Sequence, residues 1–558
     1  IAHIFHWRLN WDKKDLDFYP EEIVSSKFIT ARQSALLIRD GSTCISAGIA
    51  GNARCSVFFW AIRESFLKTG HPKDLTWISV AAQGGRGKAP GTIEEIGLPG
   101  LLKCYISGHL ETARAQLDLA AQGKLELHTL PQGVMSFILE AMAKEYPRNY
   151  CDSIVGLHTF FDPRTGNGTA IAGIGESKCE AVAENLLRYS MPRIDLAFFC
   201  VPYADNEGNL YFHDASTISE NMQSAKAARA NGGKAIATVS RIIPKNETLI
   251  SMRADEIDHI VVHPHNEQTA SVRQKRFWPM FTAGSKEDPL EGIKKIKFIN
   301  HFLKITPVRT ETDHLLGRLA AFVFTRVAHK GCLLNIGVGF PEEVGTQLMK
   351  HNLHHDIVFT TEAGAFGGLP ASGIFFGASI NPKHLESSTE MFRRYENKLD
   401  VALLGFLQID SLGNINGSKK GARITEYVGP GGMPDIAAGA KVLLFVGTWM
   451  AGAKFAVKDR QLIIEKKGRC KFVKQVDQVT FNGVEALKSG KKVFYITNVG
   501  VFILTEQGLT LTMVMPGIDI EKDILGVSEA RILLPRDNTV TVVDTSIFNQ
   551  DEYKIEWS

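Results

Sequence analysis

The stretch Thr361-Glu362-Ala363-Gly364-Ala365-Phe366-Gly367-Gly368-Leu369-Pro370 follows the apolar run Ile357-Val358-Phe359 and continues to Phe376-Gly377-Ala378-Ser379. The apolar run predicts a strand, and the glycines predict a loop whose backbone can approach a ligand closely. Glu362 stands where the strand gives way to the loop. A carboxylate in this position suits covalent catalysis on an acyl group, so Glu362 is the first candidate catalytic residue.

Short apolar runs and amphipathic segments alternate along the whole chain. Strand-like runs occur at residues 75–80, 194–201, 235–239, 259–263, 356–360, 400–405, 441–447 and 492–497. Helix-like segments occur at residues 55–68, 110–121, 216–231, 313–328, 341–351 and 384–398. This alternation predicts α/β domains with largely parallel sheets.

Matching segments in the two halves of the chain indicate an internal repeat. Ile194-Asp195-Leu196-Ala197 precedes Asp205-Asn206-Glu207-Gly208-Asn209, and Leu399-Asp400-Val401-Ala402 precedes Asp410-Ser411-Leu412-Gly413-Asn414, with the same spacing between the aspartates. A second matching pair lies upstream, at residues 41–48 and 331–337. Chance similarity is the alternative, because Asp-x-x-Gly-Asn is a common turn signature. Two pairs in the same order favour a duplication.

The repeat predicts two domains that meet near residue 290. Residues 284–291 are polar and rich in turn formers, as in a linker. We therefore expect an N-terminal extension at 1–26, a first domain at 27–290, a linker at 291–312 and a second domain at 313–558. The first half is longer between its matched points, so we expect it to carry an insertion within residues 80–190.

Composition excludes several classes of protein. The 558 residues carry a formal net charge of only +3, with the basic residues dispersed, which argues against a nucleic-acid or polybasic membrane surface. No apolar run reaches the roughly 18 residues of a membrane span. The eight cysteines lack CxxC spacing, which is typical of reduced thiols. Residues 1–25 lack the pattern of a secretory signal, so we expect a cytoplasmic protein, or an organelle-matrix protein if a transit peptide was removed.

Three further segments could donate hydrogen bonds to a negatively charged reaction intermediate. They are Leu130-Pro131-Gln132-Gly133-Val134, Asn335-Ile336-Gly337-Val338-Gly339-Phe340-Pro341 and Gly429-Pro430-Gly431-Gly432-Met433-Pro434-Asp435. Successive N–H groups in glycine-rich turns can form a nest for an anion. Ordinary strand–helix connections produce similar patterns, and spacing alone favours that alternative for Gln132.

The Glu362 motif and these segments together resemble family I CoA-transferases over about residues 27–546, most of all the single-chain acetate/propionate branch. The resemblance implies two tandem three-layer α/β/α domains of the sugar-phosphate-isomerase-like fold, with the active site between them. It also implies ping-pong transfer of CoA between a short-chain acyl-CoA and a free carboxylate, through a glutamyl-CoA thioester. The carboxylates would be of acetate, propionate, butyrate or succinate type, as in short-chain fatty acid or ketone body metabolism.

The same resemblance assigns roles to individual residues. Glu362 is expected to be the nucleophile, with Gln132, Asn335 and Gly431 as catalytic partners. The residues expected to contact CoA are Gly364, Gly377, Ala378, Ser379, Asn381 and Gly432. No metal and no cofactor besides the CoA substrate is expected, and a homo-oligomer, dimer or tetramer, is common in the family. The chain departs from the family at Asn52-Ala53-Arg54-Cys55, where Pro-Glu is usual, which leaves the acyl specificity open.

Two other functions remain as alternatives. An acyl-CoA hydrolase would differ only in letting water attack the acyl intermediate, whereas the bulky Phe366, Phe375 and Phe376 are expected to exclude water near Glu362. A CoA-binding sensor would not need the nucleophile, Gln132 and the glycine loop together. The transferase is therefore the preferred prediction.

Overall fold

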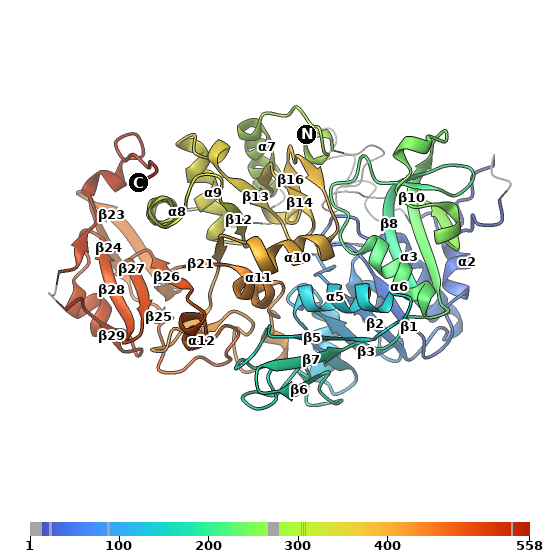
Figure 1. Cartoon of the computed structure of the whole chain (residues 1–558), viewed down its shortest axis with the longest axis horizontal. Coiled ribbons are helices and arrows are strands. Elements are labelled where there is room, and N and C mark those ends of the chain that lie inside the picture. Colours follow the sequence, from blue (N-terminus) through green and yellow to red (C-terminus); the bar gives the residue numbers. More distant parts are fainter. Residues whose placement is uncertain are drawn as a thin grey trace.

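The computed structural model describes residues 14–21, 25–85, 90–265, 278–302, 304, 306, 308–536 and 539–558. Most of the expected N-terminal extension lies outside these residues. Two large sheets lie next to each other along the long axis of the molecule, one built from the blue-to-green part of the chain and the other from the yellow-to-red part (Figure 1). The predicted α/β class with largely parallel sheets is confirmed.

The first sheet has the strand order β11-β10-β8-β1-β2-β3-β4, and its neighbouring strands along this path are parallel. Its strands are β1 (Thr43–Ser46), β2 (Leu75–Ser79), β3 (Leu102–Ser107), β4 (Glu126–His128), β8 (Leu196–Ala204), β10 (Lys234–Ile242) and β11 (His259–Val262), with the short β9 (Leu210–Tyr211) beside β8. Its helices are α2 (Ala31–Leu36), α3 (Ser56–Thr69), α4 (Arg114–Ala121), α5 (Gln132–Met142) and α6 (Asn221–Ala230).

Helices cover both faces of the first sheet. Successive residues of a strand point to opposite faces, and Trp77 and Ile78 of β2 accordingly belong to different cores. Trp77 packs with Phe58 of α3 in one core, whereas Ile78 packs with Ile138 of α5 in the other. Both faces are therefore buried, as expected for a parallel sheet.

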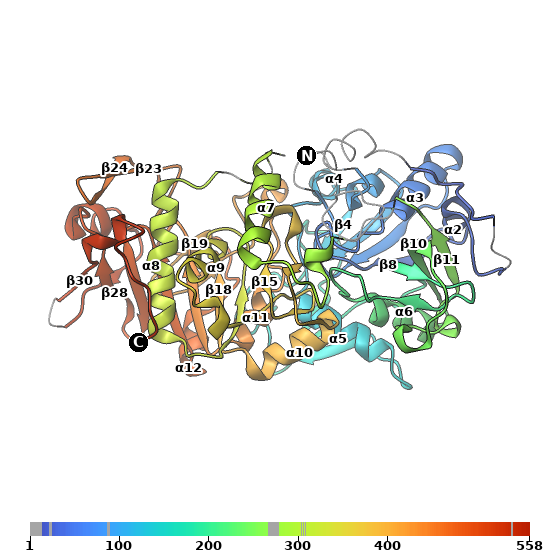
Figure 2. The same cartoon turned by 90° about the horizontal axis from the view of Figure 1, so that it is seen from above.

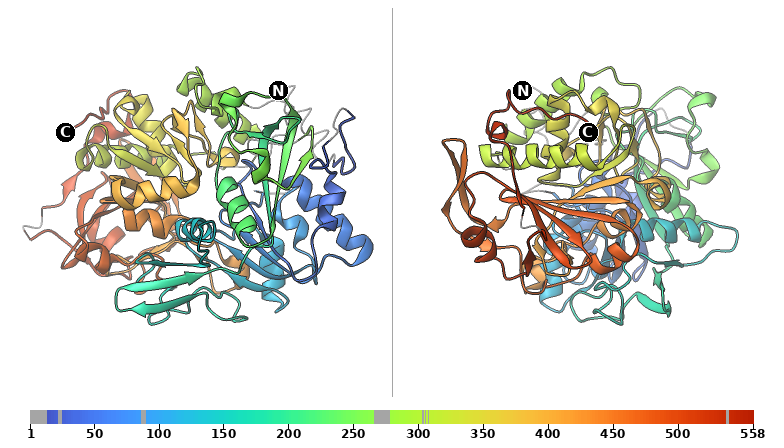
Figure 3. Two further views of the ribbon diagram at one scale, coloured as in Figure 1. Left: turned by 45° about the vertical axis from the view of Figure 1, so that its right-hand side comes forward. Right: turned by 60° about the vertical axis from the view of Figure 1, so that its left-hand side comes forward.

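The second sheet runs β17-β14-β13-β12-β18-β21-β26-β27-β28-β29, and the pairs from β13 through β26 along this path are parallel. Its strands are β12 (Leu333–Ile336), β13 (Val358–Thr360), β14 (Ala365–Phe366), β17 (His384–Leu385), β18 (Val401–Leu404), β21 (Val442–Val446), β26 (Lys492–Thr497), β27 (Gly500–Thr505), β28 (Gly508–Val514) and β29 (Ile532–Leu533), with β30 (Thr541–Val542) beside β28. Its helices are α8 (Glu311–Val327), α9 (Pro341–Lys350), α10 (Ser388–Lys398), α11 (Met433–Gly439) and α12 (Gly483–Lys488). Helix α8 lies across the second sheet (Figure 2), and the turned view shows its strands fanning out below the yellow-green helices (Figure 3, right).

The two sheets share a common strand order in their parallel parts. The series β11-β10-β8-β1-β2 corresponds to β26-β21-β18-β12-β13. The aspartates of the sequence repeat occupy equivalent places: Asp195 accepts a hydrogen bond from the Thr43 N–H at 2.8 Å, and Asp400 accepts one from the Leu333 N–H at 2.9 Å. These equivalences favour the internal repeat, while the domain boundaries stay a prediction.

Two segments add to this plan. A small antiparallel sheet of β5 (Tyr150–Ser153), β6 (Cys179–Ala183) and β7 (Leu186–Ser190) lies within residues 80–190. Helix α7 (Pro289–Phe302) occupies much of the expected linker, and its Ile296 and Ile299 pack with Phe375 in a small core. Short ribbons complete the fold: β15 (Leu369–Pro370) with β16 (Ser379–Ile380), β19 (Gln408–Ile409) with β20 (Ile415–Asn416), β22 (Met450–Ala451) with β25 (Arg469–Cys470), and β23 (Lys454–Lys458) with β24 (Gln461–Lys466).

Candidate active site

A cavity of about 920 Å³ lies where the carboxyl ends of strands from both sheets meet. Parallel strands end at one edge of their sheet, and ligands of α/β proteins bind at that edge, where loops diverge. From the first sheet, the loops after β1, β2, β3 and β4 contribute Ile49, Ala50, Gly51, Ala82, Gly84, Gly85, His109 and Gln132. From the second sheet, strand ends and loops contribute Asn335, Gly337, Val338, Gly339, Glu362, Leu404, Gly405, Phe406, Val446 and Gly447.

Glu362 lies in the cavity wall, two residues after the last residue of β13. Its side chain is half-buried, and removal of the carboxyl group from water raises its pKa above the usual range of glutamate. A hydrogen bond from the Asn335 side chain acts in the opposite direction and favours the charged form. The protein thus presents a poorly hydrated carboxylate to the cavity.

The loop after Glu362 is fixed by close backbone packing. Gly364 has a φ of +103°, and a Cβ atom built there would lie 1.8 Å from the carbonyl oxygen of Glu386. The Thr361 hydroxyl donates to the Gly377 carbonyl at 2.8 Å, and the Ala363 carbonyl accepts the Ser219 N–H at 3.3 Å. Gly364 therefore serves to hold the loop beside Glu362, because no side chain would fit at this position.

Asn335 is held by a chain of buried hydrogen bonds. Its Nδ2 donates to the Tyr395 hydroxyl at 3.0 Å, and that hydroxyl donates to Thr360 Oγ1 at 3.0 Å. All three side chains are fully buried. The chain ties β12, β13 and α10 together behind Glu362, so the sequence-predicted pair of Glu362 and Asn335 is brought together by three elements.

Gln132 enters the cavity from the opposite side, as the first residue of α5. Its N–H donates to the Gly431 carbonyl at 3.3 Å. The next two N–H groups of the helix, on Gly133 and Val134, donate to the two carboxylate oxygens of Asp435, each at 3.0 Å. A carboxylate from the second half of the chain therefore caps a helix of the first half.

The two glycines predicted in the 429–435 loop differ in their hydrogen bonding. The Gly431 N–H already donates to the Gly108 carbonyl at 2.8 Å. Within the described residues, the Gly432 N–H has no protein acceptor. Both residues line the cavity, so Gly432 is the better placed of the two to donate to a ligand there.

The other residues predicted to contact CoA lie at different places relative to the two cavities, and their contact with CoA stays a prediction. Gly377 lines a second cavity of about 490 Å³, which also contains Thr361, Phe376 and the basic side chains of Lys297 and Arg309. Gly364, Ala378, Ser379 and Asn381 line neither of these two cavities. Ala378 and Ser379 are fully buried. Ser379 belongs to the ribbon of β15 and β16, and the carbonyl of Ala378 accepts the Ala371 N–H at 2.9 Å.

The expected aromatic shield of Glu362 needs a correction. Phe375 lies fully buried in a core with Phe281, and Phe366 stacks on His384 at 4.7 Å between ring centroids. Of these three phenylalanines, Phe376 reaches the cavity of Glu362. Sequence proximity was a poor guide here because the loop turns through several positive-φ glycines, which direct neighbouring side chains to different sides.

Sequence reasoning missed several side chains of the cavity. His109, Glu111 and Lys420 form one charged group, in which Glu111 pairs with Lys420 and lies 3.9 Å from the His109 ring. Lys471 and Phe406 lie together on another part of the wall, with the Lys471 Nζ 5.3 Å from the ring centroid. These residues are far apart in sequence, and no spacing rule links them before the sheets are assembled.

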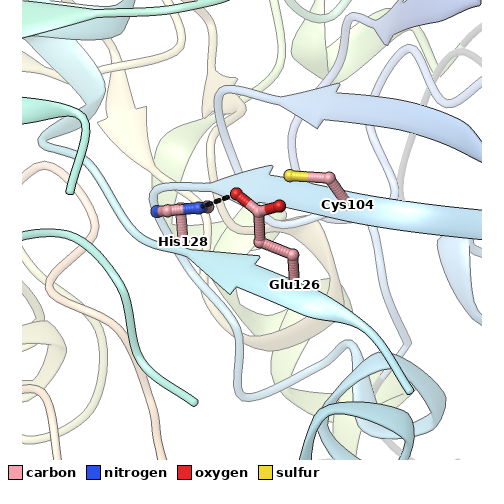
Figure 4. Close-up of side chains that lie close together, drawn as sticks. All are labelled: Cys104, Glu126 and His128. Atoms are coloured by element: carbon pink, nitrogen blue, oxygen red, sulfur yellow. Dashed lines mark hydrogen bonds and ion pairs between the residues drawn. The ribbon is translucent and has the colours of Figure 1, made fainter. Parts of the chain in front are cut away.

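A cluster elsewhere in the first sheet resembles a metal site. Within the described part of the chain, Cys104, Glu126 and His128 bring their potential ligand atoms within 4.8 Å of one another (Figure 4). His128 Nε2 lies 2.6 Å from Glu126 and its Nδ1 lies 3.1 Å from Thr169 Oγ1, while the Lys178 ammonium lies 3.6 Å from Glu126. Burial raises the pKa of the Cys104 thiol to about 12. A lysine charge and a protonated thiol favour a hydrogen-bonded network over a cation site.

No protein-family model matches the chain. Among curated proteins, the caffeate CoA-transferase of Acetobacterium woodii is 34% identical over 514 residues, which covers 90% of this chain and 93% of that protein. The acetate CoA-transferase YdiF of Escherichia coli O157:H7 is 30% identical over 507 residues, covering 89% and 91%. The YdiF apoenzyme structure matches with a TM-score of 0.82 at 26% identity, over 95% of this chain and 97% of that one. A thioester complex of YdiF with CoA matches with a TM-score of 0.81 at 27% identity, over 93% and 96%.

The fold, the desolvated carboxylate in a large cavity and these relatives together define an enzyme of the CoA-transferase class. The chain belongs to the single-chain acetate CoA-transferase family. None of the helices in the described residues combines the length and the apolarity that crossing a bilayer requires.

Proposed function

We propose that this protein transfers CoA between a short-chain acyl-CoA and a free carboxylate, with Glu362 as the nucleophile. The observation that carries the proposal is the poorly hydrated Glu362 carboxylate, held against Asn335 in a cavity large enough for an extended ligand. The thioester complex of YdiF with CoA, a protein with the same fold, supports an acyl-CoA as the ligand of this cavity. One relative is named for acetate and another for the larger caffeate, so these names set no size for the acyl group that this protein transfers.

The proposed reaction proceeds in two balanced halves. A Glu362 oxygen attacks the thioester carbonyl, the C–S bond breaks, and a mixed anhydride and the CoA thiolate form. The thiolate then attacks the Glu362 carbonyl carbon, which releases the first carboxylate and leaves a glutamyl-CoA thioester. An acceptor carboxylate repeats these steps in reverse, which gives ping-pong kinetics. Proximity and partial loss of hydration make a carboxylate sufficiently nucleophilic for the first step.

Each attack produces a tetrahedral oxyanion that needs hydrogen-bond donors. Gln132 and Gly432 line the same cavity as Glu362 and carry a side-chain amide and a backbone N–H that can donate. We propose that the Gln132 amide and the Gly432 N–H are the donors. The Gly431 carbonyl accepts the backbone N–H of Gln132 and thereby positions this residue. The loss of one such donor typically costs roughly 2.7–4 kcal/mol of transition-state stabilisation.

Mass spectrometry of the intact protein tests this function. Incubation with acetyl-CoA is expected to leave a CoA adduct on wild-type protein, and borohydride is expected to reduce the peptide that carries Glu362. Glu362→Gln should give no adduct and at least a 1,000-fold lower transfer rate to acetate, because the amide is not a nucleophile. Glu111→Gln, which changes another cavity carboxylate, is the matched control and should still form the adduct.

Two results would contradict the proposal. A Glu362→Gln variant with full transfer activity would remove Glu362 from the mechanism. Thioester loss that is equally fast with and without an acceptor carboxylate would identify a hydrolase. Binding of acetyl-CoA with neither adduct nor turnover would instead favour the sensor.

A further inference from the structure

Lys471 projects a cation into the cavity without an anionic partner in the described part of the chain. Its Nζ lies over the face of the Phe406 ring, 5.3 Å from the centroid. Burial alone lowers the pKa of Lys471 to about 8. By contrast, Lys420 in the same cavity is paired with Glu111. A lysine that is partly removed from water and lacks a counter-ion is energetically unfavourable, so an anion supplied by a ligand would stabilise it.

The main chain of Lys471 is fixed on both sides. Its N–H donates to the Trp449 carbonyl at 3.1 Å, and its carbonyl accepts the Ile409 N–H at 2.9 Å. The next residue, Phe472, packs against Trp449 with 4.6 Å between ring centroids and is fully buried. The ammonium is therefore presented from a rigid support, which reduces the entropy cost of binding a ligand group.

The strand order relates Glu362 to Phe406, the ring over which the Lys471 ammonium lies. Glu362 follows β13 and Phe406 follows β18, and the strand order is β13-β12-β18. Two strand spacings separate these strand ends by about 10 Å. The wall between them includes Val338 and Leu404, which offer an apolar surface to a hydrocarbon chain.

We propose that Lys471 binds the terminal carboxylate of acyl groups derived from dicarboxylic acids, whose thioester end lies at Glu362. This inference rests on the proposed CoA-transferase function and names a substrate class for it. A carboxylate bound in a partly dehydrated site forms a charge-assisted hydrogen bond with an ammonium, which is stronger than a neutral one. A methyl branch of the same shape in place of the carboxylate would leave the ammonium without a partner.

The phosphate groups of CoA are another possible source of anionic oxygen. Multiply charged phosphates are usually bound by several cations or by backbone N–H groups. The Lys471 ammonium instead lies over the Phe406 ring, and Leu404 and Val338 line the same cavity, a surrounding that suits a ligand with an apolar body and one charged end. The two sources predict different results, because every acyl-CoA carries the phosphates and only some carry a terminal carboxylate.

Equilibrium binding in the Glu362→Gln background tests the proposal without relying on turnover. Isothermal titration calorimetry would compare three matched pairs of thioesters: succinyl-CoA with 4-methylpentanoyl-CoA, glutaryl-CoA with 5-methylhexanoyl-CoA, and adipyl-CoA with 6-methylheptanoyl-CoA. At least one dicarboxylic thioester is expected to bind roughly 10- to 100-fold more tightly than its branched isostere. Adding Lys471→Met should abolish this preference, and Lys471→Arg should keep most of it.

Lys474→Met is the matched control, because Lys474 is exposed, lies three residues away and does not line the cavity. It should leave all affinities unchanged, and free CoA should bind equally to the Lys471→Met protein. An equal loss of affinity for free CoA and for every thioester would overturn the proposal, as would the absence of any dicarboxylate preference before Lys471 is changed. Failure of the transferase function would appear separately, as wild-type protein that forms no adduct at Glu362.

Discussion

At the scale of single residues, the chemistry of the site is set by competition between burial and hydrogen bonding. Burial raises the pKa of Glu362, and the Asn335 amide counteracts this by stabilising the carboxylate. The Tyr395 hydroxyl accepts from Asn335 and fixes the orientation of its side chain. The ionisation of Glu362 thus depends on a buried chain of hydrogen bonds from Asn335 through Tyr395 to Thr360.

Changing Asn335 should move the pH dependence of activity. The proposed reaction needs the Glu362 carboxylate, so activity is expected to be lost as pH falls through the pKa of Glu362. Asn335→Ala removes a hydrogen bond to the charged form, which should raise the pKa of Glu362 further. The acidic limb of the kcat/KM profile is expected to move to higher pH, with a lower plateau.

Tyr395→Phe provides the comparison for this experiment. It keeps the Asn335 amide and removes only the hydroxyl behind it, so the shift of the acidic limb should be smaller. An Asn335→Ala enzyme with an unchanged acidic limb would show that Asn335 does not act on the ionisation of Glu362.

At the scale of elements, the contact between α5 and α11 connects the two halves at the active site. Helix α5 begins without a side-chain cap of its own, because Pro131 precedes it. Asp435 of α11 supplies the cap, and it is buried at this junction. The left view of Figure 3 and the central region of Figure 1 show these helices next to each other. The junction holds Gln132 and the Gly431 carbonyl in fixed relative positions.

Replacing Asp435 by Asn should weaken both the junction and catalysis. The NH₂ group of the new asparagine cannot accept a hydrogen bond, so one of the two helix N–H groups that now donate to Asp435 would lose its acceptor. The free energy of unfolding should therefore fall by about 1–2 kcal/mol. Urea unfolding measures this loss. If Asp435 also positions Gln132, kcat should fall more than the affinity for CoA.

A double-mutant cycle separates the two roles of Asp435. In a Gln132→Ala background, Asp435→Asn should reduce kcat much less than in wild-type protein, because the side chain it positions is already absent. Additive effects on kcat would indicate that Asp435 contributes to stability alone.

At the scale of the whole molecule, a buried acid lies at the contact of the two halves. Glu220 lies next to the Gly48 N–H and the Ser388 hydroxyl, and its neighbour Ser219 bonds to both Ala363 and Ser388. Burial raises the pKa of Glu220 from 4.5 to about 7. The folded protein therefore holds this proton more tightly than the unfolded chain does.

This proton makes stability dependent on pH. A group with a raised pKa in the folded state stabilises the fold fully at pH values below its unfolded pKa, and this contribution is lost as pH rises through the folded pKa. Between pH 4.5 and 7 the wild type should therefore lose roughly 3 kcal/mol relative to Glu220→Gln, a figure that follows from the two pKa values. Urea unfolding of both proteins across this range measures the difference, and parallel stability curves would contradict it.

The sequence indicated the helices and strands with good accuracy, and the assignment of Glu362 as the nucleophile stays a prediction. The run at 492–497 forms β26 over the same residues, and the helix-like segment 341–351 forms α9 at Pro341–Lys350. These features are encoded locally, by periodicity and by helix- or turn-forming residues. Glu362 could be predicted as the candidate nucleophile for the same reason, because a strand, a carboxylate and a glycine loop are adjacent in the chain.

The tertiary structure alone decided which side chains share the cavity. Local sequence could not predict that Phe375 lies in a core while Phe376 lines the same cavity as Glu362. Nor could it predict that the Gly431 N–H donates to the Gly108 carbonyl, or that Asp435 caps α5. Lys471 lines the cavity only because the carboxyl ends of β18 and β21 lie at the same edge of the sheet as those of β12 and β13. The sequence determined the α/β class and singled out Glu362 as the candidate carboxylate, because the signals for both lie within a few neighbouring residues. The surroundings of that carboxylate depended on the assembly of the sheets, because burial and contacts between distant residues arise only when the chain is packed.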